Sequence, residues 1–224
     1  MNPKLSTLAL LGAALLTASA AQAQTAGTLS ARLGAMQISP SVTSGDLSPP
    51  AFPHTTADVG NASQLAGGVN YTVDDHWAID VPLALPFKHN IYGDGAIAGV
   101  GKIGETKALP ITVFAQYRFG EANAKVRPYV GAGPTYAKFF KERSTNTLTA
   151  LTGGTPSNPT TLSIESKLVP TVQFGVTLML NDRWFIDAVA AKTWLKTRTT
   201  LSTGQTLDIK LNPTTVGIMV GYRF

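Results

Sequence analysis

The chain has 224 residues, a formal charge of +5 at pH 7 and no cysteine. The absence of cysteine rules out disulfide scaffolds, thiolate metal sites and cysteine nucleophiles. The basic residues are scattered rather than clustered among aromatic residues, which argues against nucleic acid as a partner, and the length suits one domain.

Residues 1–23 are expected to be a signal peptide that is cleaved on export. Lys4 precedes a short apolar run over residues 5–16, and small residues follow as far as Ala23. This order is typical of a secretory signal, and the apolar run is too short to span a bilayer. Residues 24–224 are then expected to form a single exported domain.

The exported part alternates apolar and polar residues with a period of two, which predicts β-strands whose two faces have different surroundings. Eight strands are expected, at 28–38, 62–73, 77–87, 105–119, 127–140, 165–180, 184–197 and 207–224. Short turns at 74–76, 120–126 and 181–183 alternate with longer loops at 39–61, 88–104, 141–164 and 198–206. An even number of strands joined in this way is typical of a barrel of the bacterial outer membrane.

The distribution of polarity favours the same fold. One face of the strand at 165–180 carries an apolar row from Leu168 to Leu180, whereas inward positions elsewhere include Asn70 and Gln116. Full apolar faces on adjacent strands require either a bilayer or a second sheet packed over them. We therefore predict an all-β fold, an eight-stranded antiparallel transmembrane β-barrel with short periplasmic turns and longer extracellular loops. A soluble periplasmic β-sandwich is the alternative.

Aromatic residues with outward parity gather at the ends of strands beside the short turns. At a membrane interface, such residues form a girdle where acyl chains meet headgroups. The expected girdle consists of Trp77, Tyr117, Phe119, Trp184, Tyr222 and Phe224.

Five charged residues have inward parity in the half of the barrel nearest the short turns. They are Arg32, Asp80, Arg118, Asp187 and Arg223. We expect their carboxylates and guanidinium groups to pair, because unpaired buried charge is costly. Eight strands leave just enough width for side chains to fill, so these residues are expected to form a polar plug at the periplasmic end. Charge pairing with a purely structural role is the alternative.

The half of the lumen nearest the long loops is expected to be an apolar cup that binds ligand. Its predicted lining is Ala108, Pro110, Val169, Leu195, Leu211 and Pro213. A small hydrophobic molecule in this cup could not cross the charged plug cheaply and would leave sideways into the membrane. Proline cannot donate to the strand ladder, so Pro110, Pro134, Pro170 and Pro213 are expected to weaken pairing at the outer rim.

Two features are left open by the sequence. In the strand at 127–140, neither face is decisively apolar. In the strand at 184–197, an inward Asp187 turns Lys192 toward lipid, so either Lys192 reaches the interface or a bulge shifts the parity.

Several segments together resemble the OmpW family of small outer-membrane proteins. They are Arg32–Ala35 with Pro40, Leu85–His89, Gly101–Lys107 with Leu109-Pro110, Arg127–Gly133 with Phe139-Phe140, and Gly221–Phe224. The resemblance implies an eight-stranded barrel with a narrow, partly hydrophobic interior that passes small apolar compounds, and some relatives are linked to hydrocarbon uptake. Lys167 and Asn212-Pro213 depart from the family pattern near the upper lumen, so the ligand cannot be carried over. The ending at Phe224 resembles the signal read by the outer-membrane assembly machinery.

The predicted function is an outer-membrane channel or transporter for small hydrophobic molecules. The alternative is a non-transporting barrel that serves adhesion, stress resistance, or phage or toxin docking. The expected partners are outer-membrane lipid, small apolar solutes and the assembly machinery. The histidines lie in a loop, a turn and a strand end, and they form no Ser-His-Asp arrangement, so we expect no enzyme activity, no metal and no cofactor.

Overall fold

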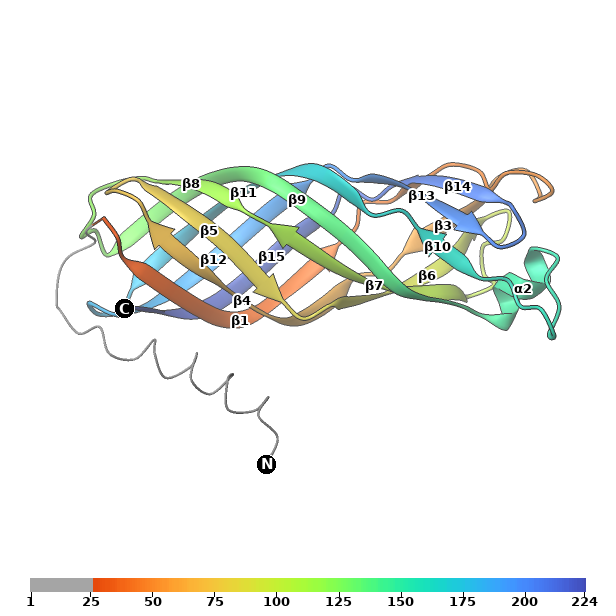
Figure 1. Ribbon diagram of the computed structural model, residues 1–224, viewed down its shortest axis with the longest axis horizontal. Coiled ribbons are helices and arrows are strands. Elements are labelled where there is room, and N and C mark those ends of the chain that lie inside the picture. The colour runs from red at the N-terminus through yellow and green to blue at the C-terminus, as the bar shows by residue number, and fades with distance from the viewer. Residues whose placement is uncertain (1–25) are drawn as a thin grey trace, which may run out of the picture.

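The computed structural model describes residues 26–224, which form a barrel of antiparallel β-strands with long hairpins at one end (Figure 1). The expected signal peptide lies outside the described residues. The barrel wall consists of β1 (Leu29–Ser39), β4 (Ala62–Thr72), β5 (Trp77–Ala84), β7 (Lys102–Thr112), β8 (Phe114–Arg118), β9 (Val126–Ser144), β11 (Lys167–Met179), β12 (Trp184–Thr193) and β15 (Thr214–Arg223). The hairpins add β2 (Thr43–Ser44), β3 (Thr55–Val59), β6 (Phe87–Gly95), α2 (Asn146–Leu151), β10 (Leu162–Ile164), β13 (Lys196–Leu201) and β14 (Thr206–Lys210). No helix within residues 26–224 is long and apolar enough to cross a membrane.

The sheet closes on itself, as predicted. Neighbouring strands follow the order β11, β12, β15, β1, β4, β5, β8 and β9, and β9 pairs again with β11. Because β7 and β8 occupy successive halves of one wall position, the barrel has eight antiparallel strands. Closure gives each wall strand two neighbours, so its backbone groups can pair without water, as a hydrocarbon environment requires. We call the end with the short turns the turn end and the end with the hairpins the loop end.

The two faces of the wall differ in polarity. On the outside, Leu168, Phe174 and Leu180 are 71%, 65% and 53% exposed, so no other part of the described chain covers this row. On the inside, Asp80 and Gln116 are fully buried. A sandwich would bury the apolar row under a second sheet, and the arrangement seen is the reverse. The predicted orientation of the strands is therefore confirmed.

The structure resolves the two features that the sequence left open. In β9, Tyr129 is buried inside and Val130 is exposed outside. In β12, Lys192 lies opposite Val172 in a register that continues without a shift. The Lys192 Nζ donates to the Asn212 carbonyl oxygen at 2.5 Å and to the Thr214 Oγ1 at 3.1 Å. Lys192 thus faces outward and reaches polar groups at the end of the strand, with no bulge.

The predicted boundaries were wrong at the loop end. Much of the expected loops at 88–104 and 198–206 is strand, because β6 runs to Gly95, β7 begins at Lys102, and β13 and β14 form a hairpin. Apart from Tyr92, the outward side chains of these hairpins are polar, so the hairpins lack the apolar outer face by which the wall strands were recognised. The expected strands at 77–87 and 105–119 are each interrupted, the first after Ala84 and the second at Val113.

Candidate functional site

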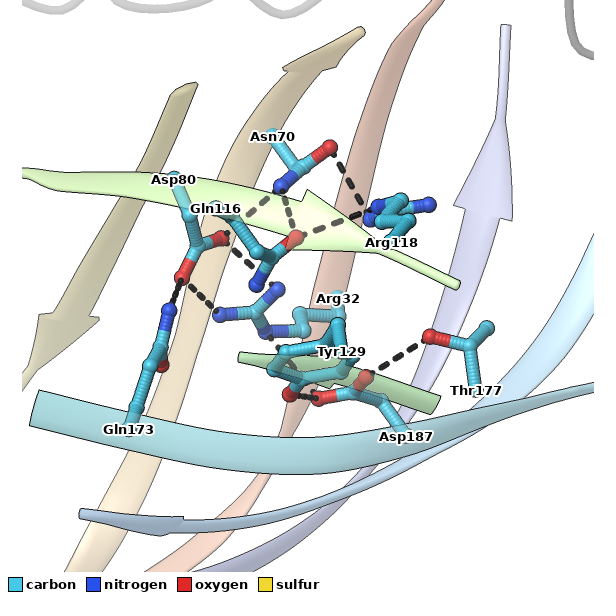
Figure 2. Close-up of polar contacts among 9 residues, drawn as sticks. All are labelled: Arg32, Asn70, Asp80, Gln116, Arg118, Tyr129, Gln173, Thr177 and Asp187. Carbon is cyan, nitrogen blue, oxygen red and sulfur yellow. Dashed lines mark hydrogen bonds and ion pairs between the residues drawn. The ribbon is translucent and has the colours of Figure 1, made fainter. Parts of the chain in front are cut away.

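A hydrogen-bonded network of 9 residues fills the lumen near the turn end (Figure 2). Its side chains come from seven wall strands, β1, β4, β5, β8, β9, β11 and β12, so it spans the barrel from wall to wall. We call it the polar network, and its members are Arg32, Asn70, Asp80, Gln116, Arg118, Tyr129, Gln173, Thr177 and Asp187.

Arg32 lies at the centre of the polar network between the two carboxylates. Its Nη1 and Nη2 contact Oδ1 and Oδ2 of Asp80, each at 2.8 Å, which is the bidentate geometry that makes such pairs strong. Its Nε lies 3.7 Å from Oδ2 of Asp187. One buried guanidinium therefore holds two buried carboxylates, as the sequence predicted for these three residues.

Uncharged side chains occupy the remaining acceptor positions of both carboxylates. Asp80 accepts from the Nδ2 of Asn70 and the Nε2 of Gln173, both at 3.3 Å. Asp187 accepts from the Oη of Tyr129 and the Oγ1 of Thr177, both at 3.1 Å. These donors offset part of the cost of removing two carboxylates from water.

The other two arginines of the predicted plug form no ion pair within residues 26–224. Arg118 donates instead to the side-chain oxygens of Gln116 and Asn70, both at 3.1 Å. Arg223 is half-buried, and its Nη2 has no partner among the described residues. On β8, Phe114 lies opposite Asp80, and Arg118 is four residues closer to the turn end. On β15, Met219 lies opposite Asp187, and Arg223 is four residues closer to the turn end. Four strand residues span roughly 13 Å, which is too far for direct pairing.

A third arginine at the turn end was missed by the sequence analysis. Arg127 is 1% exposed, and its Nη2 donates to the carbonyl oxygen of Asp75 at 2.6 Å. It was missed because the inward face of its strand could not be assigned. The inward Tyr129, two residues along, gives the parity that would have identified Arg127.

Above the polar network, the lumen is filled by apolar side chains. Phe87 and Met219 are each 1% exposed, and they belong to a buried cluster that also includes Tyr129 of the network. The same cluster reaches Ile38, which lines the cavity described next. The apolar layer therefore separates the network from that cavity.

A row of threonines runs across four adjacent wall strands at the base of the cavity. The Oγ1 of Thr135 contacts those of Thr112 at 2.8 Å and Thr171 at 2.6 Å, and Thr171 contacts Thr193 at 2.9 Å. Thr135 and Thr193 also line the cavity. Since the hydroxyls bond to one another, they present little unsatisfied polarity to a ligand above them.

The loop-end half of the barrel holds an apolar cavity with a volume of about 150 Å³. Five of the six residues predicted to form an apolar cup line it, namely Ala108, Pro110, Leu195, Leu211 and Pro213. The sixth, Val169, packs against the buried cluster that contains Leu195 and Leu211. The predicted residues are thus brought together, and their role in binding stays a proposal.

The cavity is larger than predicted because the loop-end hairpins enclose it. A buried apolar cluster at that end joins residues of β3, β7, β10, β13 and β14 to the helix α2. Its members are Ala57, Ile103, Leu148, Leu162, Leu201 and Leu207, all of which also line the cavity. Most of these residues were not predicted to line the lumen, because their segments were expected to be loops.

The wall beside the cavity contains an interruption in the strand ladder. The β5–β8 ladder ends where Asp80 pairs with Phe114, and pairing resumes in the β6–β7 ladder where Phe87 pairs with Ala108. Between these points, no register joins residues 81–86 to residues 109–113 in the described chain. We call this interruption the seam. Ala108, Leu109 and Pro110 all line the cavity, so it reaches the wall at the seam.

Prolines border the seam, but the four prolines predicted to weaken pairing do not act alike. Pro110 lies on one side of the seam, and Pro82 and Pro86 fall on or beside the other. By contrast, Pro134 and Pro170 lie opposite each other in the β9–β11 ladder, whose register continues on both sides. A proline within a wall strand therefore does not by itself interrupt the ladder, whereas Pro82, Pro86 and Pro110 all border the stretch where pairing is interrupted.

The predicted aromatic girdle lies on the outside of the turn end. Edge-to-face contacts join Trp77 to Tyr117 and Trp184 to Tyr222, with ring centroids 5.2 and 5.1 Å apart. Phe119 and Phe224 extend these two groups. The placement suits a membrane interface, and the roles of these rings and of Phe224 in assembly stay predictions.

Comparison with known proteins agrees with this architecture. The sequence model of the OmpW family matches residues 25–224. Outer membrane protein W of Vibrio cholerae is 36% identical over 170 residues, which cover 74% of this chain and 76% of the relative. PahQ, a dibenzothiophene metabolism operon protein of Pseudomonas aeruginosa, is 23% identical over 175 residues, covering 77% of this chain and 76% of PahQ.

Among solved structures, the crystal structure of the outer membrane protein OprG from Pseudomonas aeruginosa is similar throughout. The superposition has a TM-score of 0.80 at 25% identity, and it covers 92% of this chain and 99% of OprG. Together with the fold, these likenesses place the protein in the bacterial outer membrane. The turn end then faces the periplasm and the loop end faces the outside.

Proposed function

Because the chain belongs to the OmpW family of outer-membrane proteins, we propose that it passes small hydrophobic molecules from outside the cell into the membrane. The observation that carries the proposal is the apolar cavity at the extracellular end. It is closed below by buried side chains and reaches the barrel wall at the seam.

The volume and lining of the cavity support the proposed class of ligand. An apolar cavity of about 150 Å³ holds a molecule of roughly the size of benzene. Transfer of such a molecule from water into an apolar site is favourable in proportion to the apolar area removed from water. The name of PahQ, a relative that belongs to an operon for metabolism of an aromatic compound, supports the same class of solute.

Passage straight through the barrel would be costly for this ligand. It would have to displace Phe87 and Met219, which are each 1% exposed, and then separate Arg32 from Asp80. Separating a buried charge pair without new partners costs several kcal/mol, on the order of 3–5 kcal/mol. An apolar molecule offers no such partners, so its route is sideways.

The seam provides that route at lower cost. Elsewhere, a lateral opening would break a continuous row of backbone hydrogen bonds in lipid, where each unsatisfied group is expensive. At the seam, no such row connects residues 81–86 to residues 109–113. Opening therefore requires only the displacement of side chains such as Leu109, which lies between the cavity and the exterior.

The proposal is tested by restoring a donor at the seam. The change Pro110→Val supplies a backbone N–H and a β-branched side chain on the edge of the seam. The matched control is Pro170→Val, since Pro170 lies in a continuous ladder. Uptake of benzene or toluene by a strain that lacks the native protein should fall with Pro110→Val and stay unchanged with Pro170→Val, and sugar uptake should respond to neither.

The rival function is a barrel that transports nothing and whose hairpins serve adhesion, stress resistance, or phage or toxin docking. It predicts that removal of the protein leaves uptake of apolar solutes unchanged. That result would refute the transport proposal, whereas loss of uptake without any effect of Pro110→Val would refute only the seam.

A further inference from the structure

The outer surface of β6, β7 and β9 changes from apolar to basic at one level near the loop end. The outward row of β5 and β6 passes from Leu83 and Leu85, both more than half exposed, to Lys88. On β7, the outward row passes from Ile111 through Leu109 to Lys107. The opposing strand β9 carries Lys138 opposite Leu109 and Phe140 opposite Lys107.

This level corresponds to the outer membrane surface. Lys107 lies ten residues along the wall from Tyr117, which belongs to the aromatic girdle at the turn end. Ten residues at about 3.3 Å each, tilted by about 40°, rise by roughly 25 Å, which is the height of the apolar band in outer-membrane barrels. The basic residues therefore meet the headgroups of the outer leaflet.

The basic residues gather around a depression of about 280 Å³. We call its charged lining the basic patch, and its members are Lys88, Lys107, Lys141 and Arg143, with Glu105 among them. Four cations and one carboxylate give a formal charge of +3 (4 − 1).

Within the basic patch, repulsion between cations is only partly relieved. Lys88 and Lys107 pair directly across the β6–β7 ladder, an arrangement that is unfavourable for like charges. Lys88 is bound to Glu105 at 2.9 Å, and Glu105 is also held by Lys102 at 2.5 Å. Lys107, Lys141 and Arg143 form no ion pair within residues 26–224, so Glu105 neutralises only part of the positive charge of the patch.

A β-bulge in β9 places two members of the basic patch on the outer face. Lys107 of β7 lies opposite Phe140 of β9, and Glu105, two residues from Lys107, lies opposite Arg143, three residues from Phe140. Between these two pairs, two residues of β9 therefore face one residue of β7. Lys141 lies in the bulge with a φ of 53°, a left-handed conformation that is uncommon for a residue with a side chain. Without the extra residue, Arg143 would alternate to the lumen side, whereas the bulge turns it toward Lys107 and Glu105.

We propose that the basic patch binds the phosphate groups of the phosphorylated glycolipid, lipopolysaccharide, in the outer leaflet. The height of the patch, its uncompensated cations and the bulge that turns Arg143 outward all favour an anionic headgroup. Basic clusters at a membrane surface bind such headgroups through the charge–charge attraction and charge-assisted hydrogen bonds that phosphate oxygens accept. The glycolipid then joins the outside of the barrel next to the loop-end hairpins.

The test titrates the folded, full chain in phosphatidylcholine nanodiscs with bisphosphorylated lipid A and counts bound lipid by native mass spectrometry. The double change K88Q/K107Q should weaken lipid A binding by roughly 25-fold, because each lysine near an anionic surface contributes about a factor of five. The matched control is K196Q/K210Q, which removes another pair of lysines that face each other across a ladder, in the β13–β14 hairpin. The control should change binding less than about twofold, and heat-modifiable gel mobility should show that both variants are folded.

Further arms identify the chemical group and its source. Dephosphorylated lipid A should bind as weakly to the native chain as lipid A binds to K88Q/K107Q, and inorganic phosphate at millimolar concentration should not replace the lipid. Glu105→Gln should tighten lipid A binding, since it frees Lys88 and Lys102. Equal binding of both forms of lipid A, displacement by free phosphate, or unchanged binding by K88Q/K107Q would each overturn the proposal.

Discussion

The polar network and the apolar cavity are built on the same strands, yet one closes the lumen and the other leaves it open. Along the inward face of β11, Thr177 and Gln173 belong to the network, and Thr171 forms the base of the cavity. Along β9, Tyr129 lies in the network and Ala137 lines the cavity. In a barrel this narrow, the size and polarity of inward side chains decide whether a level is sealed, because the backbone is the same at both levels.

The two regions also differ in what they contribute. The network joins seven strands through charged, amide and hydroxyl groups that hydrogen-bond to one another, so it is expected to specify and hold the closed end. The cavity leaves apolar side chains without close neighbours, which lowers stability but provides space for a ligand. Under the proposed function, stability and binding belong to opposite ends of one lumen, and the following changes test that division.

The largest effect is expected from breaking the charged centre of the network. Asp80→Leu leaves Arg32 with only the 3.7 Å contact to Asp187 and removes the acceptor of Gln173. Loss of one partner from a buried pair costs roughly 3–5 kcal/mol. The free energy of unfolding in urea, measured in lipid vesicles, should fall by that amount. An exposed carboxylate change, Asp208→Asn, is the control, and equal effects of the two would contradict a stabilising role for the network.

Filling the cavity should impair uptake and leave the fold intact. Ala108→Phe places an aromatic ring into the space beside the seam, and uptake of toluene should fall by more than about tenfold, which corresponds to about 1.4 kcal/mol of lost binding. Ala115→Phe, on the exposed outer face of β8, is the matched control and should transport normally. Equal uptake by both variants would show that the cavity is not on the route.

An intermediate effect is expected at the boundary between the two regions. Thr135→Val removes the hydroxyl that contacts both Thr112 and Thr171, so each of these loses a partner. The cost is about 1–2 kcal/mol in the free energy of unfolding. Uptake of toluene should not decrease, because the base of the cavity becomes more apolar. Loss of uptake would indicate that the hydroxyls take part in binding.

The smallest effect concerns the extracellular hairpin β13–β14, outside the membrane. Arg198 binds the Asp208 carboxylate with its Nε at 2.7 Å and its Nη2 at 2.9 Å, and this hydrogen bonding holds the pKa of Asp208 below its usual value of 3.8. Since the folded pKa is lowered, the stabilisation is complete above pH 3.8 and is lost as the pH falls through the lowered pKa. The protection of amides in residues 196–210, measured against the intrinsic exchange rate at each pH, should fall slightly below pH 4, and Asp208→Asn should abolish this pH dependence.

The sequence predicted the wall of the barrel because a bilayer imposes a period-two pattern that can be recognised directly. Leu168 and Phe174 were correctly placed outside, and Asp80 and Arg32 were correctly placed inside. Five of the six expected lining residues also meet in the cavity, since parity and distance from the turns suffice to locate them.

The sequence could not predict the features that depend on register. The partners of Arg118 follow from the offset between β5 and β8, and the outward turn of Arg143 follows from the bulge at Lys141. Neither the offset nor the bulge can be recognised from the alternation of apolar and polar residues. The loop-end hairpins were missed because water on their outer side removes the apolar face that marks a wall strand. The seam between β5 and β7 depends on where one ladder stops and another begins, which a period-two pattern does not record.

Lateral release is tested most directly by measuring where the protein delivers its ligand. The protein is placed in vesicles with a polar reporter dye in their aqueous interior and an apolar reporter dye in the bilayer. An aromatic solute that quenches both dyes is then added. Lateral release into the membrane predicts faster quenching of the bilayer reporter than in protein-free vesicles, with no protein-dependent release of an entrapped sugar. Faster quenching of the aqueous reporter before the bilayer reporter, together with release of the sugar, would contradict it.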